Sequence, residues 1–283
     1  MKHAATEAEL ARYRRDGYFV REHVFAEPEL VRMRASVESV HVRVAAAAAA
    51  PDAPKTERID DKRYQDLLGS SVKWEWQEAR MDVRSMEPFL HLDAELERLV
   101  DDPRLWQPAA ALCGADRLAL FTDKLNFKRP GGAEFPWHQD SPYFAFECPH
   151  VDRLVSLQLY LDDATVENGC LWMIPGSHTH GRLPCFEAQG TLGRLYTDLE
   201  RALPGAQPVP IGAPAGTVIF FNGDVVHGSR RNRTAQSRRA FVLTYQPAGH
   251  AQFRRPGIRP VRSAGEDRSA GEISCAAESA LPV

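Results

Sequence analysis

The chain has 283 residues, 43% of them hydrophobic and 26% charged, which is the composition of a folded globular protein rather than of a disordered or fibrous one. Its 35 Lys and Arg residues and 38 Asp and Glu residues give a formal net charge of −3, and no segment is strongly basic, so a surface for nucleic acid or anionic membrane is not expected. The longest apolar run, the alanines at 45–50, is far shorter than the ~20 residues that cross a bilayer.

The N-terminal segment and the cysteines indicate where in the cell the protein is expected to act. The first residues carry charges throughout and lack the apolar stretch of a secretory signal. The five cysteines are widely spaced and form no CxxC pair, which argues against a disulfide framework. We therefore expect a cytoplasmic monomer or homodimer that acts on a small molecule, with no nucleic-acid or membrane partner.

Residues 6–44 have the pattern of a helical layer. Thr6 and Glu9 have the spacing of a capping box, which predicts a helix start. A second helical stretch has apolar residues at Leu30, Met33, Val37, Val40 and Val44. Between the two stretches, DGYFVREHVF predicts a glycine break and a short strand. The Ala- and Pro-rich residues 45–55 predict a loop or a frayed helix end.

From about 117 to 247 the sequence consists of short β-type runs separated by Gly, Pro and Asn. These runs are LALFTDKLNFK, RLVSLQLYL, GCLWMIP, GTVIFF and RAFVLTYQP. Many short strands at close spacing predict a sandwich or a barrel. Residues 251–283 are polar and are expected to form a flexible tail. We predict one domain over 1–250, mainly β, with a helical N-terminal layer against the β core.

Two imidazoles and one carboxylate form a candidate metal site. In PWHQDSPYF, His138 and Asp140 are two positions apart, and in an extended chain this spacing puts both side chains on one face. Alone, such a pair is equally compatible with a surface loop. His227 is expected to end the apolar strand in GTVIFFNGDVVHGS. Two His and one carboxylate on neighbouring strands are typical of the facial triad of non-haem Fe(II) oxygenases.

A candidate carboxylate clamp follows the second histidine. Arg238 comes eleven residues after His227 on the next β run, and a strand, a turn and a return strand would bring its guanidinium beside the metal. Arg suits bidentate binding of a carboxylate, and a dicarboxylate that chelates iron at one end needs such a partner at the other. Ser229 can add a hydroxyl to the same carboxylate.

The sequence resembles the phytanoyl-CoA dioxygenase family of Fe(II)/2-oxoglutarate oxygenases. The resemblance rests on PWHQDSPYF, ENGCLWMIPGSH and GTVIFFNGDVVHGSRRNRTAQSRRAF, in family order, and on the N-terminal DGYFVREHVFAEPEL. It implies a double-stranded β-helix, which is a jelly-roll or cupin-like core. It also implies that the iron ligands and catalytic residues are His138, Asp140 and His227. By the same resemblance, Arg238 and Ser229 bind the distal carboxylate of 2-oxoglutarate.

The resemblance extends to further residues and to the reaction. Asn126 corresponds to a position that faces 2-oxoglutarate or substrate, and Gln158 to a neighbour of the co-substrate. Fe(II), 2-oxoglutarate and O2 are the implied cofactor and co-substrates, with release of succinate and CO2. Halogenating relatives have Gly or Ala in place of the carboxylate ligand, so Asp140 favours hydroxylation over chlorination. The implied reaction is hydroxylation of an unactivated C–H bond of a small molecule. We expect that molecule to belong to natural-product metabolism.

Three alternatives remain open at this point. The chain could hydroxylate an acyl-CoA or another acyl thioester, as a member of the same family. It could be a hydrolytic zinc enzyme, or a cupin-like metal-binding protein without redox chemistry. Neither of the last two needs the Arg238 clamp, so both are less favoured.

The substrate pocket is expected to be walled by several segments. These are the residues after the metal motif, Trp172, the segment 74–80 and the long connection 181–210. The residues of the first segment are Ser141, Tyr143, Phe144 and Phe146. Connections much longer than the usual ~4–6 residues are often active-site lids, so residues 181–210 are predicted to form a mobile cover.

Overall fold

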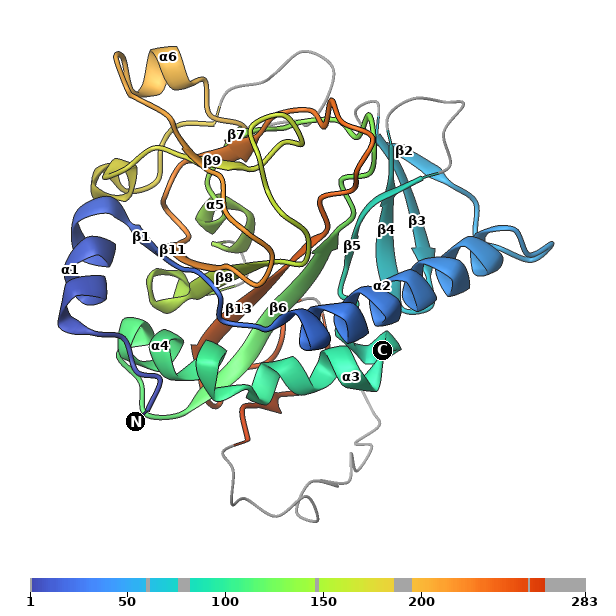
Figure 1. Ribbon diagram of the computed structural model, residues 1–283, viewed down its shortest axis with the longest axis horizontal. Helices are drawn as coiled ribbons and strands as arrows, with labels where there is room; N and C mark the ends of the chain where they lie inside the picture. Colours follow the sequence, from blue (N-terminus) through green and yellow to red (C-terminus); the bar gives the residue numbers. More distant parts are fainter. Residues whose placement is uncertain are drawn as a thin grey trace, which may run out of the picture.

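The computed structural model describes residues 2–59, 62–75, 82–145, 148–185, 195–253 and 255–262. In this part of the chain, two antiparallel sheets enclose a cavity, and helices cover the outer face of the larger sheet (Figure 1). This is the jelly-roll arrangement that the sequence predicts, so the expected fold class, mainly β with a helical N-terminal layer, is confirmed.

The larger sheet contains strands from the whole length of the chain. Its order is β1-β11-β8-β13-β6-β5-β4-β3-β2, and β14 also pairs with β6. The bounds are β1 Tyr18–Arg21, β2 Glu57–Ile59, β3 Lys62–Leu67, β4 Ser70–Trp74, β5 Val83–Glu87, β6 Leu118–Asn126, β8 Val155–Tyr160, β11 Val218–Asn222, β13 Ala240–Pro247 and β14 Arg259–Pro260. Strands β1 to β5 and β14 therefore extend the sheet beyond residues 117–247.

The smaller sheet is made of four short strands in the order β10-β9-β12-β7. Their bounds are β7 Phe135–His138, β9 Leu171–Met173, β10 Val209–Ile211 and β12 His227–Ser229. Each of these strands comes from a motif on which the family resemblance rests, or from the connection next to one.

The helices gather mainly in the N-terminal half of the chain. Their bounds are α1 Glu7–Asp16, α2 Glu27–Ala48, α3 Ala94–Glu97, α4 Pro103–Cys113, α5 Ser141–Phe144 and α6 Leu199–Ala202. Short 3-10 helices are η1 Leu90–Leu92, η2 Arg98–Asp101, η3 Val151–Arg153 and η4 Ser177–His180. None of the helices in the described residues is both long and apolar enough to span a bilayer.

The N-terminal layer forms as predicted. The Thr6 hydroxyl accepts from the Glu9 backbone N–H and the Glu9 carboxylate accepts from the Thr6 backbone N–H, which completes the capping box. Gly17 ends α1 with φ +84, and the strand β1 that follows pairs with β11. The apolar face of α2 packs on the larger sheet through Leu30, Met33, Val37, Val40 and Val44.

The larger sheet has one apolar and one polar face over β3 to β6. Since successive side chains of a strand alternate, Val72 and Leu125 point into the core under the helices, while their neighbours Lys73 and Lys124 line the cavity. The fold therefore separates a hydrophobic layer from a polar cavity wall within the same strands.

The C-terminal segment is described in part. Phe253 packs on Phe121 and Phe144, and β14 pairs with β6. Residues 263–283 of the predicted tail lie outside the described residues.

Candidate functional site

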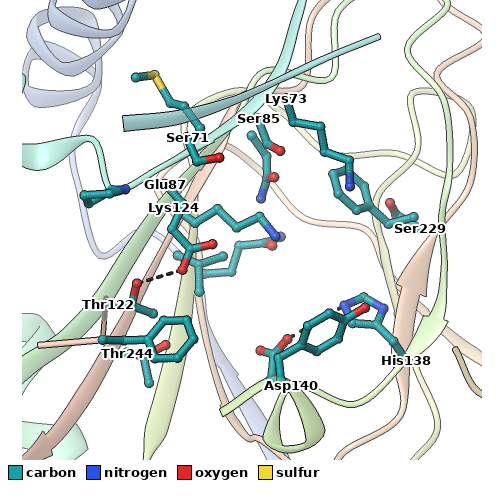
Figure 2. Close-up of a pocket in the computed structure, with 18 of the residues that line it drawn as sticks. Ser71, Lys73, Ser85, Glu87, Thr122, Lys124, His138, Asp140, Ser229 and Thr244 are labelled. Atoms are coloured by element: carbon teal, nitrogen blue, oxygen red, sulfur yellow. Dashed lines mark hydrogen bonds and ion pairs between the residues drawn. The ribbon is translucent and has the colours of Figure 1, made fainter. Parts of the chain in front are cut away.

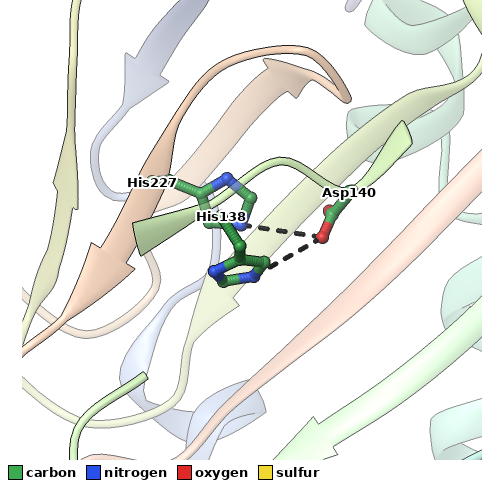
Figure 3. A group of neighbouring side chains, drawn as sticks. All are labelled: His138, Asp140 and His227. Carbon is green, nitrogen blue, oxygen red and sulfur yellow. Dashed lines mark ion pairs between the residues drawn. The ribbon is translucent and has the colours of Figure 1, made fainter. Parts of the chain in front are cut away.

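Three side chains that the sequence singled out meet at one end of the cavity, and we call them the metal triad: His138, Asp140 and His227 (Figure 3). His138 is the last residue of β7 and faces His227, the first residue of β12, in register. Each Nε2 lies 3.7 Å from the Asp140 Oδ1, and the two ring centroids are 4.3 Å apart. The ligand atoms of the three residues all lie within 4.8 Å of one another.

The local reason for this convergence differs from the prediction. Asp140 is not in an extended strand: its φ of −79° and ψ of −37° are helical, and β7 ends at His138. The expectation that the two residues share a strand face is therefore wrong. The Asp140 backbone N–H donates to the Gly223 carbonyl (2.8 Å), which holds the turn that aims the carboxylate at the imidazoles. His227 likewise begins the short strand β12 rather than ending β11.

Both imidazoles are held in the tautomer that a metal ligand needs. His138 Nδ1 lies 2.7 Å from the Pro136 carbonyl and His227 Nδ1 lies 2.9 Å from the Val225 carbonyl. A carbonyl only accepts, so each Nδ1 carries the proton and each Nε2 presents its lone pair toward Asp140. Burial, followed by the charge of His227, lowers the pKa of His138 well below its usual value. This keeps the imidazole neutral.

The predicted clamp residue Arg238 is buried and lines the same cavity. Its Nη2 donates to the Gly169 carbonyl (2.8 Å), while its buried Nε has no hydrogen-bond partner among the described residues. The neighbouring Arg239 faces away from the cavity and pairs with Asp162 (2.7 Å). Arg238 is thus a guanidinium with donor capacity left over, which suits an anionic ligand.

A second cation beside Arg238 was missed by the sequence analysis. The buried Lys128 donates from Nζ to the Ser229 hydroxyl (2.8 Å) and to the Ala133 carbonyl (3.1 Å). Burial, followed by the charge of Arg238, lowers the pKa of Lys128 well below its usual value. Its one signal in the sequence is a charged residue two positions after the strand LALFTDKLN.

The two remaining predicted residues also face the cavity. Asn126 on β6 and Gln158 on β8 are buried, and both flank β13. The Asn126 Oδ1 and the Gln158 Nε2 lack hydrogen-bond partners in the described structure. Both residues therefore offer an unused polar atom to whatever occupies the cavity.

The cavity has a volume of about 710 Å³, and its walls differ in part from the prediction (Figure 2). Tyr143 and Phe144 line it as expected. Trp74 is instead buried in the main core, and Trp172 packs under the Arg230 guanidinium (4.1 Å). Phe146 and residues 76–80 lie outside the described residues. Much of the wall comes from β3 to β5, which the sequence analysis did not identify: Lys62, Tyr64, Ser71, Lys73, Ser85 and Glu87.

Among the described residues of the connection 181–210, Tyr196 lines the cavity. Tyr196 forms a β-bridge with His138 and is buried, and its hydroxyl has no hydrogen-bond partner among the described residues. A short helix, α6, follows. Residues 186–194 lie outside the described residues, and the mobile cover stays a prediction.

Comparison with known proteins agrees with this site. A family model described as phytanoyl-CoA dioxygenase (PhyH) matches residues 13–240. Methylphosphonate hydroxylase of Gimesia maris is 27% identical over 254 residues, covering 90% of this chain and 85% of the relative. L-proline trans-4-hydroxylase of Streptomyces griseoviridis is 29% identical over 258 residues, covering 83% and 84%.

Solved structures share the fold. EctD from S. alaskensis, crystallised with 2-oxoglutarate and 5-hydroxyectoine, has a TM-score of 0.66 at 25% identity, covering 89% of this chain and 80% of that chain. The structure of the same protein with bound Fe has a TM-score of 0.67 at 24% identity, covering 89% and 81%.

Proposed function

This chain belongs to the phytanoyl-CoA dioxygenase family, and we propose that it hydroxylates a C–H bond of a small organic molecule with the metal triad as its iron ligands. It is an enzyme of the dioxygenase class that uses iron, 2-oxoglutarate and O2. When bound, iron and 2-oxoglutarate activate O2, so that one oxygen atom enters the substrate and the other enters succinate as CO2 leaves.

The donor set of the triad suits iron. Two imidazole nitrogens and one carboxylate oxygen form the facial triad of non-haem Fe(II) oxygenases, which leaves further coordination positions for co-substrate and O2. The backbone carbonyls of Pro136 and Val225 hold both rings with Nε2 deprotonated. In this role the chain orients the ligands before the metal arrives, so little rearrangement accompanies binding.

The buried cations suit the distal carboxylate of 2-oxoglutarate. Arg238 supplies its unpaired Nε, Ser229 its hydroxyl, and Lys128 a second positive charge hydrogen-bonded to that hydroxyl. Gln158 and Asn126 offer further polar atoms on the same cavity wall. Within the described residues neither Lys128 nor Arg238 forms an ion pair, and burial lowers the pKa of both, so a carboxylate taken into this region would supply a close counter-charge.

One observation carries the proposal: the three metal-donor atoms and the unpaired Arg238 lie in one cavity. A hydrolytic zinc enzyme or a non-redox cupin-like protein has no use for a buried cation with an unpaired donor. The volume of about 710 Å³ lies in the range of small-molecule sites and favours a free small molecule over an acyl-CoA. The two relatives described above are named hydroxylases of methylphosphonate and of L-proline, which are small molecules.

The test is O2 consumption coupled to succinate release, measured with Fe(II) and 2-oxoglutarate. We expect turnover by the wild-type chain and none by His138→Ala, with His180→Ala, an exposed residue away from the cavity, as the matched control. Phosphate-ester or peptide hydrolysis without O2 consumption would contradict the proposal. The narrower role in natural-product metabolism and the cytoplasmic location stay predictions; mass spectrometry of a metabolite extract for products heavier by one oxygen atom tests the first.

A further inference from the structure

Two lysines enter the cavity from strands that the metal triad does not use. Lys73 lies on β4 and Lys124 on β6, with β5 between them. Both line the cavity, and Figure 2 shows their side chains extending into it from the side opposite His138 and Asp140. Neighbouring strands are about 4.8 Å apart, so two long side chains from β4 and β6 can reach the same small group.

The wall around these lysines carries an excess of positive charge. The Lys62 ammonium lies over the Tyr196 ring at 5.9 Å, on the same cavity. Burial, followed by the charges of Arg84 and of the other two cavity lysines, lowers the pKa of Lys73 well below its usual value. Like charges have thus been gathered here at an electrostatic cost, which an anion bound between them would relieve.

The acidic side chains of the wall offset the charge of the two lysines only in part: the charge of Glu87 raises the pKa of Lys73, but burial and the neighbouring cations outweigh it. In the described part of the chain, neither Lys73 nor Lys124 forms an ion pair. Their ammonium groups lie over aromatic rings, Lys73 over Tyr64 (5.4 Å) and Lys124 over Phe135 (5.7 Å). Glu87 on the intervening β5 instead accepts a hydrogen bond from the Thr122 hydroxyl (2.7 Å), and Asp66 on β3 is exposed. The two ammonium groups therefore keep their donors for a ligand.

This pair of lysines is separate from the candidate co-substrate site. Arg238, just before β13, donates to the Gly169 carbonyl, and Lys128, two residues after β6, donates to the Ser229 hydroxyl. Lys73 and Lys124 instead lie within β4 and β6. Lys73 and Lys124 nevertheless line the same cavity as the metal triad, so a ligand held by the lysines lies in the space that the triad faces.

We propose that Lys73 and Lys124 bind an oxyanion group, a phosphonate or a carboxylate, of the primary substrate. The inference rests on the proposed function and names the substrate class for that same cavity. The carbon to be oxidised then lies between this group and the metal triad, because the lysines and the triad occupy opposite sides of one cavity. The oxyanion orients the substrate and takes no part in the redox step.

The experiment measures binding without turnover. The full chain is loaded with Zn(II) and 2-oxoglutarate, and isothermal titration calorimetry is performed with propylphosphonate, butyrate and the neutral butyramide. We expect both anions to bind and butyramide to bind at least about ten-fold more weakly than butyrate, since charge-assisted hydrogen bonds are lost. Comparison of the two anions decides between phosphonate and carboxylate.

Variants connect this binding to the two lysines. Lys73→Met and Lys124→Met are each expected to weaken binding of the preferred anion by about ten- to hundred-fold, while Lys124→Arg retains most of it. Lys55→Met, at an exposed lysine outside the cavity, is the matched control. Melting temperatures verify that each variant is folded, and the dissociation constant of 2-oxoglutarate should be unchanged in all of them.

Several results would overturn the inference. These are a wild-type chain that binds neither anion, equal affinities for butyrate and butyramide, and unchanged anion affinity in both methionine variants. A loss of 2-oxoglutarate affinity in the same variants would also overturn it, because the lysines would then belong to the co-substrate site. Failure of the proposed function is distinguishable, because it appears as absent 2-oxoglutarate binding and absent succinate release in the wild-type chain before any anion is added.

Discussion

At the scale of single residues, the two histidines of the metal triad have the same local arrangement. Each Nδ1 donates to the carbonyl two residues earlier, Pro136 for His138 and Val225 for His227. A backbone acceptor at this offset holds the ring and its tautomer through the local chain alone. The hydrogen bonds therefore persist when the opposite side chain is removed, and each histidine can be tested separately.

We predict that His227→Ala abolishes stoichiometric Fe(II) binding without unfolding the chain. Loss of one of three ligands leaves a site that no longer holds the ion firmly, whereas the removed side chain carries little of the core. Metal content after anaerobic loading and desalting is the measurement, with circular dichroism as the folding check. An iron content equal to that of the wild-type chain would show that His227 is not a ligand.

We predict that Arg238→Ala raises the dissociation constant of 2-oxoglutarate by roughly 10- to 150-fold. This factor corresponds to the loss of the charge-assisted hydrogen bonds between the guanidinium and the carboxylate. Bound iron should be unchanged, because the guanidinium does not belong to the metal triad. Arg230→Ala, at an exposed arginine stacked on Trp172, serves as the control. Unchanged 2-oxoglutarate affinity would assign the carboxylate to Lys128 instead.

At the scale of elements, the turn before β9 holds the guanidinium in place. The carbonyl of Gly169 accepts from Arg238 Nη2, and Gly169 has a φ of +82°. A Cβ at this position would lie 2.3 Å from the Arg230 carbonyl oxygen and 2.7 Å from Lys128 Cε. A residue larger than glycine is therefore disfavoured at position 169 for two reasons. The positive φ strains its backbone, and its Cβ would clash with the Arg230 carbonyl and with the Lys128 side chain.

We predict that Gly169→Ala lowers both stability and 2-oxoglutarate affinity. Gly205→Ala is the matched control. Gly205 has a similar φ of +78°, but no atom would lie within 4 Å of a Cβ at this position. The strain of a positive φ is common to both variants, about 1 kcal/mol. The free energy of unfolding in urea and the dissociation constant of 2-oxoglutarate are measured for both variants. Any loss in Gly169→Ala beyond that in Gly205→Ala is due to the clash. Equal effects of the two variants would mean that the turn simply accommodates the methyl group.

At the scale of the whole molecule, acidic residues on α1 and α2 join these two helices to neighbouring segments. Glu9 on α1 pairs with Arg21 of β1 (2.6 Å), Glu29 on α2 with Arg104 of α4 (2.8 Å), and Glu38 on α2 with Arg129 (2.8 Å). The Arg104 hydrogen bond lowers the pKa of Glu29 below its usual value. Burial alone would raise the pKa of Glu9 and of Glu38, and their arginine partners outweigh it, so both are lowered.

Because the pKa values of these three carboxyls are lowered in the folded protein, we predict that the folded state becomes less stable at acid pH. A carboxyl whose folded pKa is depressed contributes stability above its unfolded value, 4.5 here, and loses it as pH falls through the folded pKa. We expect the free energy of unfolding in urea to fall below about pH 4.5. Glu29→Gln should cost about 1 kcal/mol at pH 7 and show a smaller further fall, whereas Glu200→Gln, at an exposed position, should follow the wild-type curve. Parallel curves for wild type and Glu29→Gln would refute the linkage.

The elements with a local signal could be predicted. The capping box at Thr6, the periodic face of α2 and the five β runs between 117 and 247 all form where expected. The strands β2 to β5 were not identified, because KRYQDL, SSVKW and VRSME are short, polar on the cavity face and stabilised by pairing with β6 and with one another. Because these strands were missed, Lys62 on β3 and Lys73 on β4 were not recognised as cavity residues.

By itself the sequence determined the set of chemical groups: two imidazoles, a carboxylate and an arginine in motifs whose order and spacing indicate the family. The tertiary structure alone decided how Asp140 turns toward the imidazoles, that Lys128 hydrogen-bonds to Ser229, and that Lys73 lines the cavity. The physical reason is the distance in sequence over which the two kinds of interaction act. Motifs act through neighbours in the chain, whereas a cavity is assembled by strand pairing and burial between segments far apart in sequence, which no local pattern of residues records.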